Sequence, residues 1–213
     1  MDLFDAIAAG DEQAALDALD QGPARHPTGP TPVLYALYHG HPELARRLAA
    51  RRGALDLAEA AALDDAARVA ELIEGGAAAD TRTPDGYTPL QLAAFFGAPA
   101  AAALLLQRGA DPGAVADNPM RVQPLHAAVA GRHHEIAARL VAAGVDVDAR
   151  QQGGYTPLLA AAGSGDTALV RLLVDAGADP GLADDQGVRP AELAAQHGHD
   201  GLADELRAAT VPR

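Results

Sequence analysis

Apolar and small side chains recur along the chain in blocks that each predict two short helices. In the clearest block, 84–111, Leu90 and Ala94 share one face of a first helix because they are four residues apart. A second apolar run follows at 100–107, and Gly109 then supplies the residue type that favours a left-handed helix end. Helices this short are unstable alone, so the block needs neighbours that cover its apolar faces.

The start of this block carries turn and capping signals. Asp85-Gly86 predicts a tight turn, since glycine adopts positive φ without strain. Thr88 can cap a helix through its hydroxyl, and Pro89 suits the first helical position, where no amide donor is needed. Gln91 completes a capping-box pattern with Thr88. The first helix is therefore expected to begin at Pro89.

The same offsets return along the chain. The positions that open the copies are Thr31, Leu55, Thr88, Gln123, Thr156 and Arg189. The spacing is 33 residues at most steps and 35 before Gln123, where the connecting loop is longer. With a degenerate copy in 1–22, this makes about seven units of helix pairs. Such pairs can bury their apolar faces only by stacking into a solenoid.

The motifs Thr-Pro-Leu, Ala-Ala, Gly-His and Gly-Ala-Asp stand at fixed offsets within the copies. This pattern resembles the ankyrin repeat over nearly the whole chain. The resemblance implies an all-α ankyrin-repeat solenoid of stacked antiparallel helix pairs. It also implies β-hairpin-like connections between successive pairs, projecting at one edge, which we call fingers. The regular period predicts a rod about 60–70 Å long, at roughly 10 Å for each helix pair.

The resemblance predicts one ankyrin-repeat domain spanning 1–213. Its expected parts are an N-terminal cap repeat (1–30), a repeat lacking the following finger (31–54), central repeats (55–187) and a C-terminal cap repeat (188–209). The loop 21–30 stands where the first finger is expected.

Two connections depart from the pattern. Thr31 and Leu55 are only 24 residues apart, so about nine residues, the length of a finger, are missing. We expect a tight turn at Arg52-Gly53, a notch in the concave wall, and N-terminal units partly separate from the binding surface. In the fifth unit the finger is longer, and Arg132 replaces the expected glycine, which leaves the local helix geometry open.

Composition narrows the classes of function. The net charge is −13, and all 16 basic residues are arginine, so neither nucleic acid nor an anionic membrane is an expected partner. Without cysteine there is no disulfide or thiolate chemistry, and without lysine there is no P-loop. The N-terminus lacks a signal-peptide pattern, and the apolar run 92–106 is too short to span a bilayer. We expect a cytoplasmic protein, and the arginine- and alanine-rich composition suggests a bacterial source.

Three groups of polar residues are candidates for chemistry. Histidines pair at His39/His41, His133/His134 and His197/His199, and Asp80, Asp111, Asp146 and Asp179 recur once in each repeat. A metal site is conceivable, but the histidine pairs fall at the Gly-His offset between helices, and the aspartates are expected to form a solvated row. For His126, the resemblance implies a hydrogen bond to the turn of a neighbouring repeat. We therefore expect no catalysis, cofactor or metal.

A basic cluster, Arg46, Arg47, Arg51 and Arg52, is expected to solvate the convex face beside Asp64 and Asp65. The favoured role for these side chains is solvation, with anion binding as the alternative.

For partner contacts, the resemblance implies finger residues and the exposed end of each first helix. The corresponding positions are Tyr38, His39, Leu63, Tyr87, Phe95, Phe96, Val122, Tyr155, Gln196 and His197. Five of the seven aromatic residues fall in this set, and Tyr87, Phe95 and Phe96 form its expected centre. As an alternative, the tyrosines cover turns and one Phe packs between helices. Adjacent helical residues point about 100° apart, so at least one Phe should lie in the groove beside Tyr87.

The sequence thus predicts a module that binds a protein partner through its concave face and is monomeric alone. One alternative is a structural subunit docked permanently on an enzyme, which would not be stable as a monomer. A third is a metal- or small-ligand-binding protein that uses the histidines.

Overall fold

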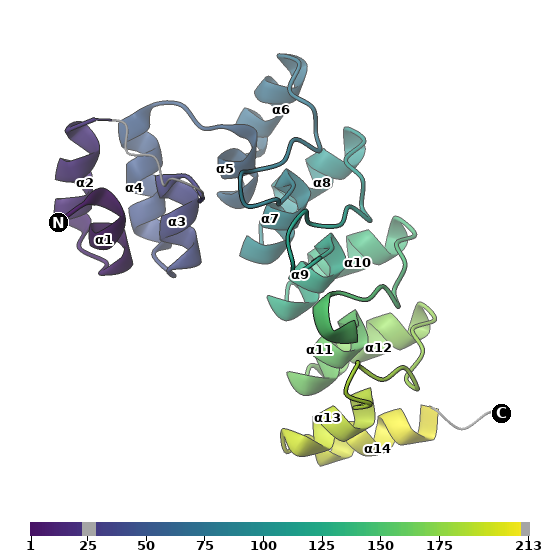
Figure 1. Cartoon of the computed structure of the whole chain (residues 1–213). Coiled ribbons are helices and arrows are strands. Elements are labelled where there is room, and N and C mark those ends of the chain that lie inside the picture. The colour runs from purple at the N-terminus through teal and green to yellow at the C-terminus, as the bar shows by residue number, and fades with distance from the viewer. Residues whose placement is uncertain (23–28, 210–213) are drawn as a thin grey trace.

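The computed structural model describes residues 1–22 and 29–209 (Figure 1). These residues contain fourteen α-helices in seven consecutive pairs, one 3-10 turn and no strand. The helices are α1 (Leu3–Ala8), α2 (Glu12–Asp20), α3 (Pro32–Tyr38), α4 (Pro42–Arg52), α5 (Leu57–Ala62), α6 (Ala66–Glu74), α7 (Pro89–Phe96), α8 (Pro99–Gln107), α9 (Pro124–Ala130), α10 (His134–Ala142), α11 (Pro157–Gly163), α12 (Thr167–Asp175), α13 (Pro190–Gln196) and α14 (Asp200–Ala209), and the 3-10 turn η1 is Gln152–Gly154. The all-α solenoid prediction is confirmed.

The capping signals act as predicted. The hydroxyls of Thr31, Thr88 and Thr156 each accept a hydrogen bond from the amide three residues later, at 3.3 Å. The Gln91 side-chain oxygen accepts a hydrogen bond from the Thr88 amide, which completes the capping box. At the other end of its pair, Gly109 takes a φ of 85°, as a left-handed helix end requires. Local sequence therefore sets where these three helices begin and where this pair ends.

The core forms two clusters of buried side chains. The larger cluster runs through the stack from Leu57 in α5 to Leu206 in α14. The smaller cluster belongs to α1–α4 and reaches Ala58 and Ala62 in α5 and Leu92 in α7. Alanine is frequent in both clusters, and its small side chain lets neighbouring helices approach closely.

The fingers are hydrogen-bonded turns that also bond to one another. The amide of Asp117 donates to the carbonyl of Gly86 at 2.9 Å, and that of Gln152 donates to Met120 at 3.0 Å. The amide of Asp185 donates to Gly153 at 2.9 Å. These bonds link four successive fingers along one edge of the stack.

The junction without a finger has the predicted tight turn. Helix α4 ends at Arg52, Gly53 takes a φ of 74°, and α5 begins at Leu57. Figure 1 shows that α1–α4 lie at an angle to the stack of α5–α14, so the molecule is bent at this point instead of forming a straight rod. The expected first finger at 21–30 lies largely outside the described residues.

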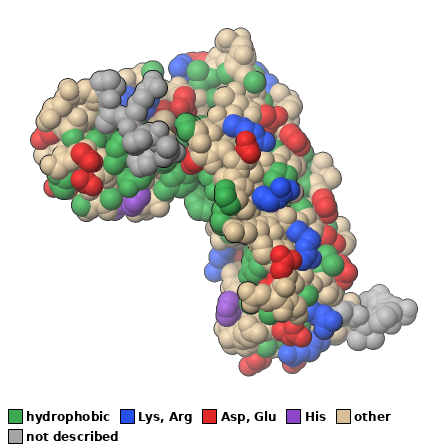
Figure 2. Space-filling model, in the orientation of Figure 1, with side chains coloured by type: hydrophobic (Ala, Val, Ile, Leu, Met, Phe, Trp, Pro, Cys, Tyr) green, Lys and Arg blue, Asp and Glu red, His purple; other side chains and the backbone are tan. Residues whose placement is uncertain are grey.

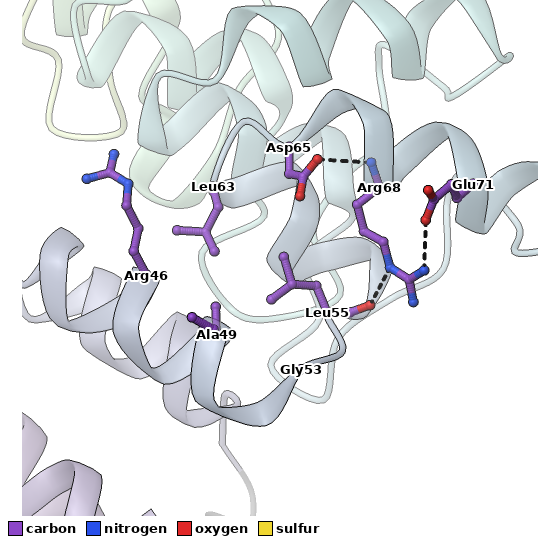
Figure 3. Close-up of a pocket in the computed structure, with 9 residues that line it drawn as sticks. Arg46, Ala49, Gly53, Leu55, Leu63, Asp65, Arg68 and Glu71 are labelled. Atoms are coloured by element: carbon purple, nitrogen blue, oxygen red, sulfur yellow. Dashed lines mark hydrogen bonds and ion pairs between the residues drawn. The ribbon is translucent and has the colours of Figure 1, made fainter.

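The predicted notch in the concave wall is wrong. A cleft of about 620 Å³ separates the outer helices α4 and α6, and Leu55 and Leu63 line it (Figure 3). On the inner face Tyr38 instead contacts Phe96, so α3 takes part in the concave surface. The short segment 54–56 cannot space the two helix pairs evenly, and the outer helices therefore spread apart while the inner face stays closed.

The arginines of the basic cluster form ion pairs with four other carboxylates. Arg46 pairs with Glu43, Arg47 with Glu12, Arg51 with Asp20 and Arg52 with Glu59. None of these carboxylates is Asp64 or Asp65. Asp64 accepts a hydrogen bond from the Ala101 amide at 2.8 Å, and Asp65 caps α6 by accepting one from the Arg68 amide at 3.0 Å.

Candidate functional site

The inner face carries a groove of about 330 Å³ at the bend. Its walls come from the end of α3, from α7 and α9, and from three fingers, the third of which contributes Gln151. The side chains that dominate the lining are Tyr38, Tyr87, Leu92, Phe95, Met120 and Val122. Figure 2 shows hydrophobic side chains gathered in the inner corner between the two arms of the molecule. A groove of this size accommodates one or two bulky side chains of a partner.

Two large apolar side chains are exposed within this groove. Phe95 and Met120 each have 47% of their surface exposed. Among the described residues, Met1 is the only other large hydrophobic in the same class. Isolated exposed apolar side chains are common, but two that line one groove make a contiguous apolar surface.

The two adjacent phenylalanines divide as the helix geometry predicts. The Phe95 ring faces the groove, while Phe96 is half-buried against the smaller core cluster. Their centroids lie 5.0 Å apart with the rings nearly perpendicular, and Phe96 lies 5.5 Å from the Tyr38 ring. Phe95 and Tyr87 line the same groove, so the expected placement of one Phe beside Tyr87 is confirmed.

The longer finger brings Met120 and Val122 to the groove. The buried Gln91 amide donates to the Ala114 carbonyl at 2.8 Å and to the Val122 carbonyl at 2.6 Å. At the tip, the Asn118 side chain accepts from the Met120 amide at 3.1 Å. The same side chain donates to the Asp85 carbonyl, in the preceding finger, at 2.9 Å. The finger is therefore held at both ends.

Tyr38 forms the wall on the α3 side. Its hydroxyl donates to the Asp85 carboxylate at 3.0 Å. Burial, and then the charge of Asp85, raise the pKa of Tyr38 far above its usual value. The phenol therefore stays neutral and can donate this bond at any physiological pH.

The structure places two of the predicted contact residues outside the groove. Leu63 lines the cleft between α4 and α6, because the finger-less junction turns the end of α5 away from the groove. His39 is exposed, with its ring 4.2 Å from that of Tyr35.

Three more predicted residues lie further along the stack. Tyr155 is half-buried, and its carbonyl accepts from His126 Nε2 at 3.2 Å, the bond between repeats predicted for His126. Gln196 and His197 are exposed at the end of α13, where His197 Nδ1 donates to the Gly163 carbonyl at 2.7 Å. The groove therefore collects Tyr38, Tyr87, Phe95 and Val122, with Phe96 behind them.

Several lining residues were absent from the sequence-based set. They are Gln91, Leu92, Met120, His126, Ala127, Ala130 and Gln151. The only sequence signal that could have placed Met120 in the groove was the two-residue extension of its finger. Gln91 was not expected there because its capping-box pattern indicated only a local role at the start of α7. Burial lowers the pKa of His126, which keeps this side chain neutral in the wall.

Other histidines join neighbouring repeats. His133 Nε2 donates to the Phe95 carbonyl at 3.1 Å, which helps to fix the end of α7 beside the groove. The described part of the chain contains no group of three or more His, Cys, Asp or Glu side chains arranged to hold a metal ion.

Arg132 keeps the repeat geometry despite replacing a glycine. It adopts a φ of 58°, and its Nε donates to the buried Asp166 carboxylate at 2.9 Å. His134 Nε2 lies 3.0 Å from the same carboxylate, which also accepts from the Leu169 amide at 3.2 Å as the cap of α12. Burial alone would raise the pKa of Asp166, but these bonds outweigh it and hold the pKa below its usual value.

This network predicts a pH-dependent contribution to stability. A carboxylate with a lowered folded-state pKa stabilises the fold above its unfolded pKa of about 3.9, and that contribution is lost as pH falls through the folded value. Asp166→Asn should therefore lower the free energy of unfolding by about 1–2 kcal/mol at pH 7, with a smaller difference from wild type below about pH 4. Urea denaturation at pH 7 and pH 3 measures this, and an equal loss at both values would contradict it.

Comparison with known families decides what these repeats are. The family of "Ankyrin repeats (3 copies)" matches residues 57–151 and 125–210, well over half of the chain. The chain belongs to the ankyrin repeat family. Ankyrin repeats act as protein–protein interaction modules and are generally not enzymes.

Curated relatives of this ankyrin-repeat chain are much longer proteins. Human neurogenic locus notch homolog protein 4 is 43% identical over 112 residues, which cover 51% of the chain and 5% of that protein. Human neurogenic locus notch homolog protein 2 is 34% identical over 187 residues, 85% of the chain and 7% of that protein. Ankyrin repeat protein nuc-2 of Neurospora crassa is 34% identical over 133 residues, 62% of the chain and 12% of that protein. The chain thus spans only a small part of each.

Within the described residues, no ankyrin helix is both long and apolar enough to cross a membrane.

Proposed function

We propose that this ankyrin-repeat chain binds a protein partner through the groove at the bend of its concave face. The observation that carries the proposal is the pairing of exposed Phe95 and Met120 across one apolar groove. Exposed aromatic side chains in a concave apolar surface are typical centres of interface binding energy. The occupant would be a protein segment that inserts a bulky aliphatic or aromatic side chain between these two residues.

The remaining predicted contact residues have different places in this proposal. Tyr38, Tyr87 and Val122 would contact the inserted side chain, and Phe96 would support the wall from behind. His39, Leu63, Tyr155, Gln196 and His197 lie outside the groove and are proposed only as sites of peripheral contact. The proposal also includes four expectations from the sequence. They are the domain layout with its parts, a monomeric free state, a partner other than nucleic acid and a cytoplasmic location.

Selection from a displayed peptide library tests this function. Peptides enriched on the wild-type chain should share one bulky apolar anchor residue, and Met120→Asp should abolish their binding because a carboxylate would be placed in the apolar groove. Ala100→Asp is the matched control, since it introduces the same carboxylate at an exposed position of α8 that does not line the groove. Peptides without an apolar anchor, or peptides that bind Met120→Asp as well as wild type, would overturn the proposal.

A further inference from the structure

The boundary between α1–α4, here called the N-terminal arm, and the stack of α5–α14 is closed on one face and open on the other. On the outer face a cleft of about 620 Å³ separates α4 from α6 (Figure 3). On the inner face, Tyr38 of the arm bonds to Asp85 and packs against Phe96 of the stack. The arm therefore has room to move on one side and a specific contact on the other.

Among the described residues, no backbone hydrogen bond between fingers ties the arm to the stack. In three later fingers, Asp117, Gln152 and Asp185 each donate an amide to the preceding finger. The equivalent position in the finger 83–87 is Pro84, which has no amide hydrogen to donate. Because of this proline, a finger from another molecule could not form the same amide bond with the finger 83–87. The row of finger-to-finger bonds therefore ends at this finger, and the side of the finger that faces the arm is left free to move.

The core narrows at the same boundary. The buried side chains of the arm belong to the smaller cluster, which takes in only Ala58, Ala62 and Leu92 from the buried residues of the stack. The covalent link consists of the short segment 53–56, which begins at Gly53 with a φ of 74°. Two bodies that share few buried side chains and are joined by a short irregular link are expected to move relative to each other.

We propose that the N-terminal arm is hinged at 53–56 and that Tyr38 is the latch that holds it closed. In the closed form the Tyr38 hydroxyl bonds to Asp85 and its ring forms a wall of the groove. In the open form that bond breaks, the outer cleft narrows and the groove loses this wall. If the groove binds a partner as proposed above, a partner that touches Tyr38 binds the closed form and stabilises it.

The absence of cysteine from the sequence allows the movement to be measured with paired spin labels. One pair, Glu43→Cys with Ala67→Cys, spans α4 and α6 at exposed positions that do not line the cleft. The matched pair, Ala100→Cys with Ala138→Cys, spans α8 and α10 within the stack. Pulsed electron–electron double resonance should give a broad or two-component distribution of distances between the spin labels for the first pair, and a single narrow distribution for the second.

The latch is tested in the same samples. Tyr38→Phe keeps the ring but removes the hydroxyl, and it should raise the ratio of open to closed arm about tenfold, which corresponds to ~1.4 kcal/mol. Tyr87→Phe removes a hydroxyl from the neighbouring tyrosine and should leave the distribution unchanged. A narrow α4–α6 distribution that Tyr38→Phe does not alter would overturn the hinge. That result would not affect the proposal that a peptide binds at Phe95. Conversely, an arm that moves in a chain that binds no peptide would contradict only the proposed function.

Discussion

Replacing Phe95 with alanine is expected to weaken binding of a groove-directed peptide by about 2 kcal/mol or more, roughly 30-fold. The free energy of unfolding should fall by only about 0.5–1 kcal/mol, because nearly half of this ring is already exposed. Phe96→Ala should show the opposite balance. Its half-buried ring packs against Tyr38 and the smaller core cluster, so we expect a loss of about 2–3 kcal/mol, somewhat below that of a fully buried Phe.

The two variants serve as controls for each other, since they remove the same ring from adjacent positions. Chemical denaturation and titration calorimetry on the same preparations separate stability from affinity. A stability loss of 3 kcal/mol or more in Phe95→Ala would place this ring in the core. In that case the proposed centre of the groove would be wrong.

Arg52→Ala is expected to lower the free energy of unfolding by about 2–3 kcal/mol. The Glu59 carboxylate is fully buried in α5, and Arg52, the last residue of α4, forms its ion pair. Removing one partner of a buried pair typically costs about 3–5 kcal/mol, and the value here should be smaller because Arg52 is partly solvated and Glu59 retains the Asp56 amide at 3.0 Å. This ion pair therefore stabilises the junction that lacks a finger.

Two further variants make the test specific. Glu59→Gln in the Arg52→Ala background should recover most of the loss, since the neutral amide still accepts the Asp56 bond without burying a charge. Arg51→Ala removes the neighbouring guanidinium, whose partner Asp20 is exposed, and should hardly change the denaturation midpoint. Equal losses for Arg51→Ala and Arg52→Ala would contradict the role given to the buried carboxylate.

Much of the fold could be predicted because it depends on local signals that recur. Thr88 and Gln91 formed the predicted capping box, and Gly53 ended α4 where the missing residues required a turn. The bend could not be predicted, since it depends on how two helix pairs pack when their spacer is absent. The offset of a residue within the repeat predicts its neighbours only where the stacking is regular, and Leu63, at the irregular junction, lines the cleft between α4 and α6 and not the groove.

The candidate site was predictable in part for the same reason. Tyr87, Phe95 and Val122 lie in regular repeats and line the groove as their offsets indicated. Met120 was missed because two extra residues in a finger do not specify the direction of its side chains. That direction depends on the hydrogen bonds from Asn118 to Asp85 and from Gln91 to Val122, which join residues 33 and 31 positions apart in sequence.

The most direct test of the central claim is amide hydrogen exchange of the wild-type chain with and without a saturating selected peptide. Occupation of the groove should slow exchange in three segments that are separate in sequence: the end of α3, the region 85–96 and the long finger through α9. The outer helices α10, α12 and α14 should exchange at unchanged rates. Protection confined to those outer helices, or to the α4–α6 cleft, would contradict binding at the groove.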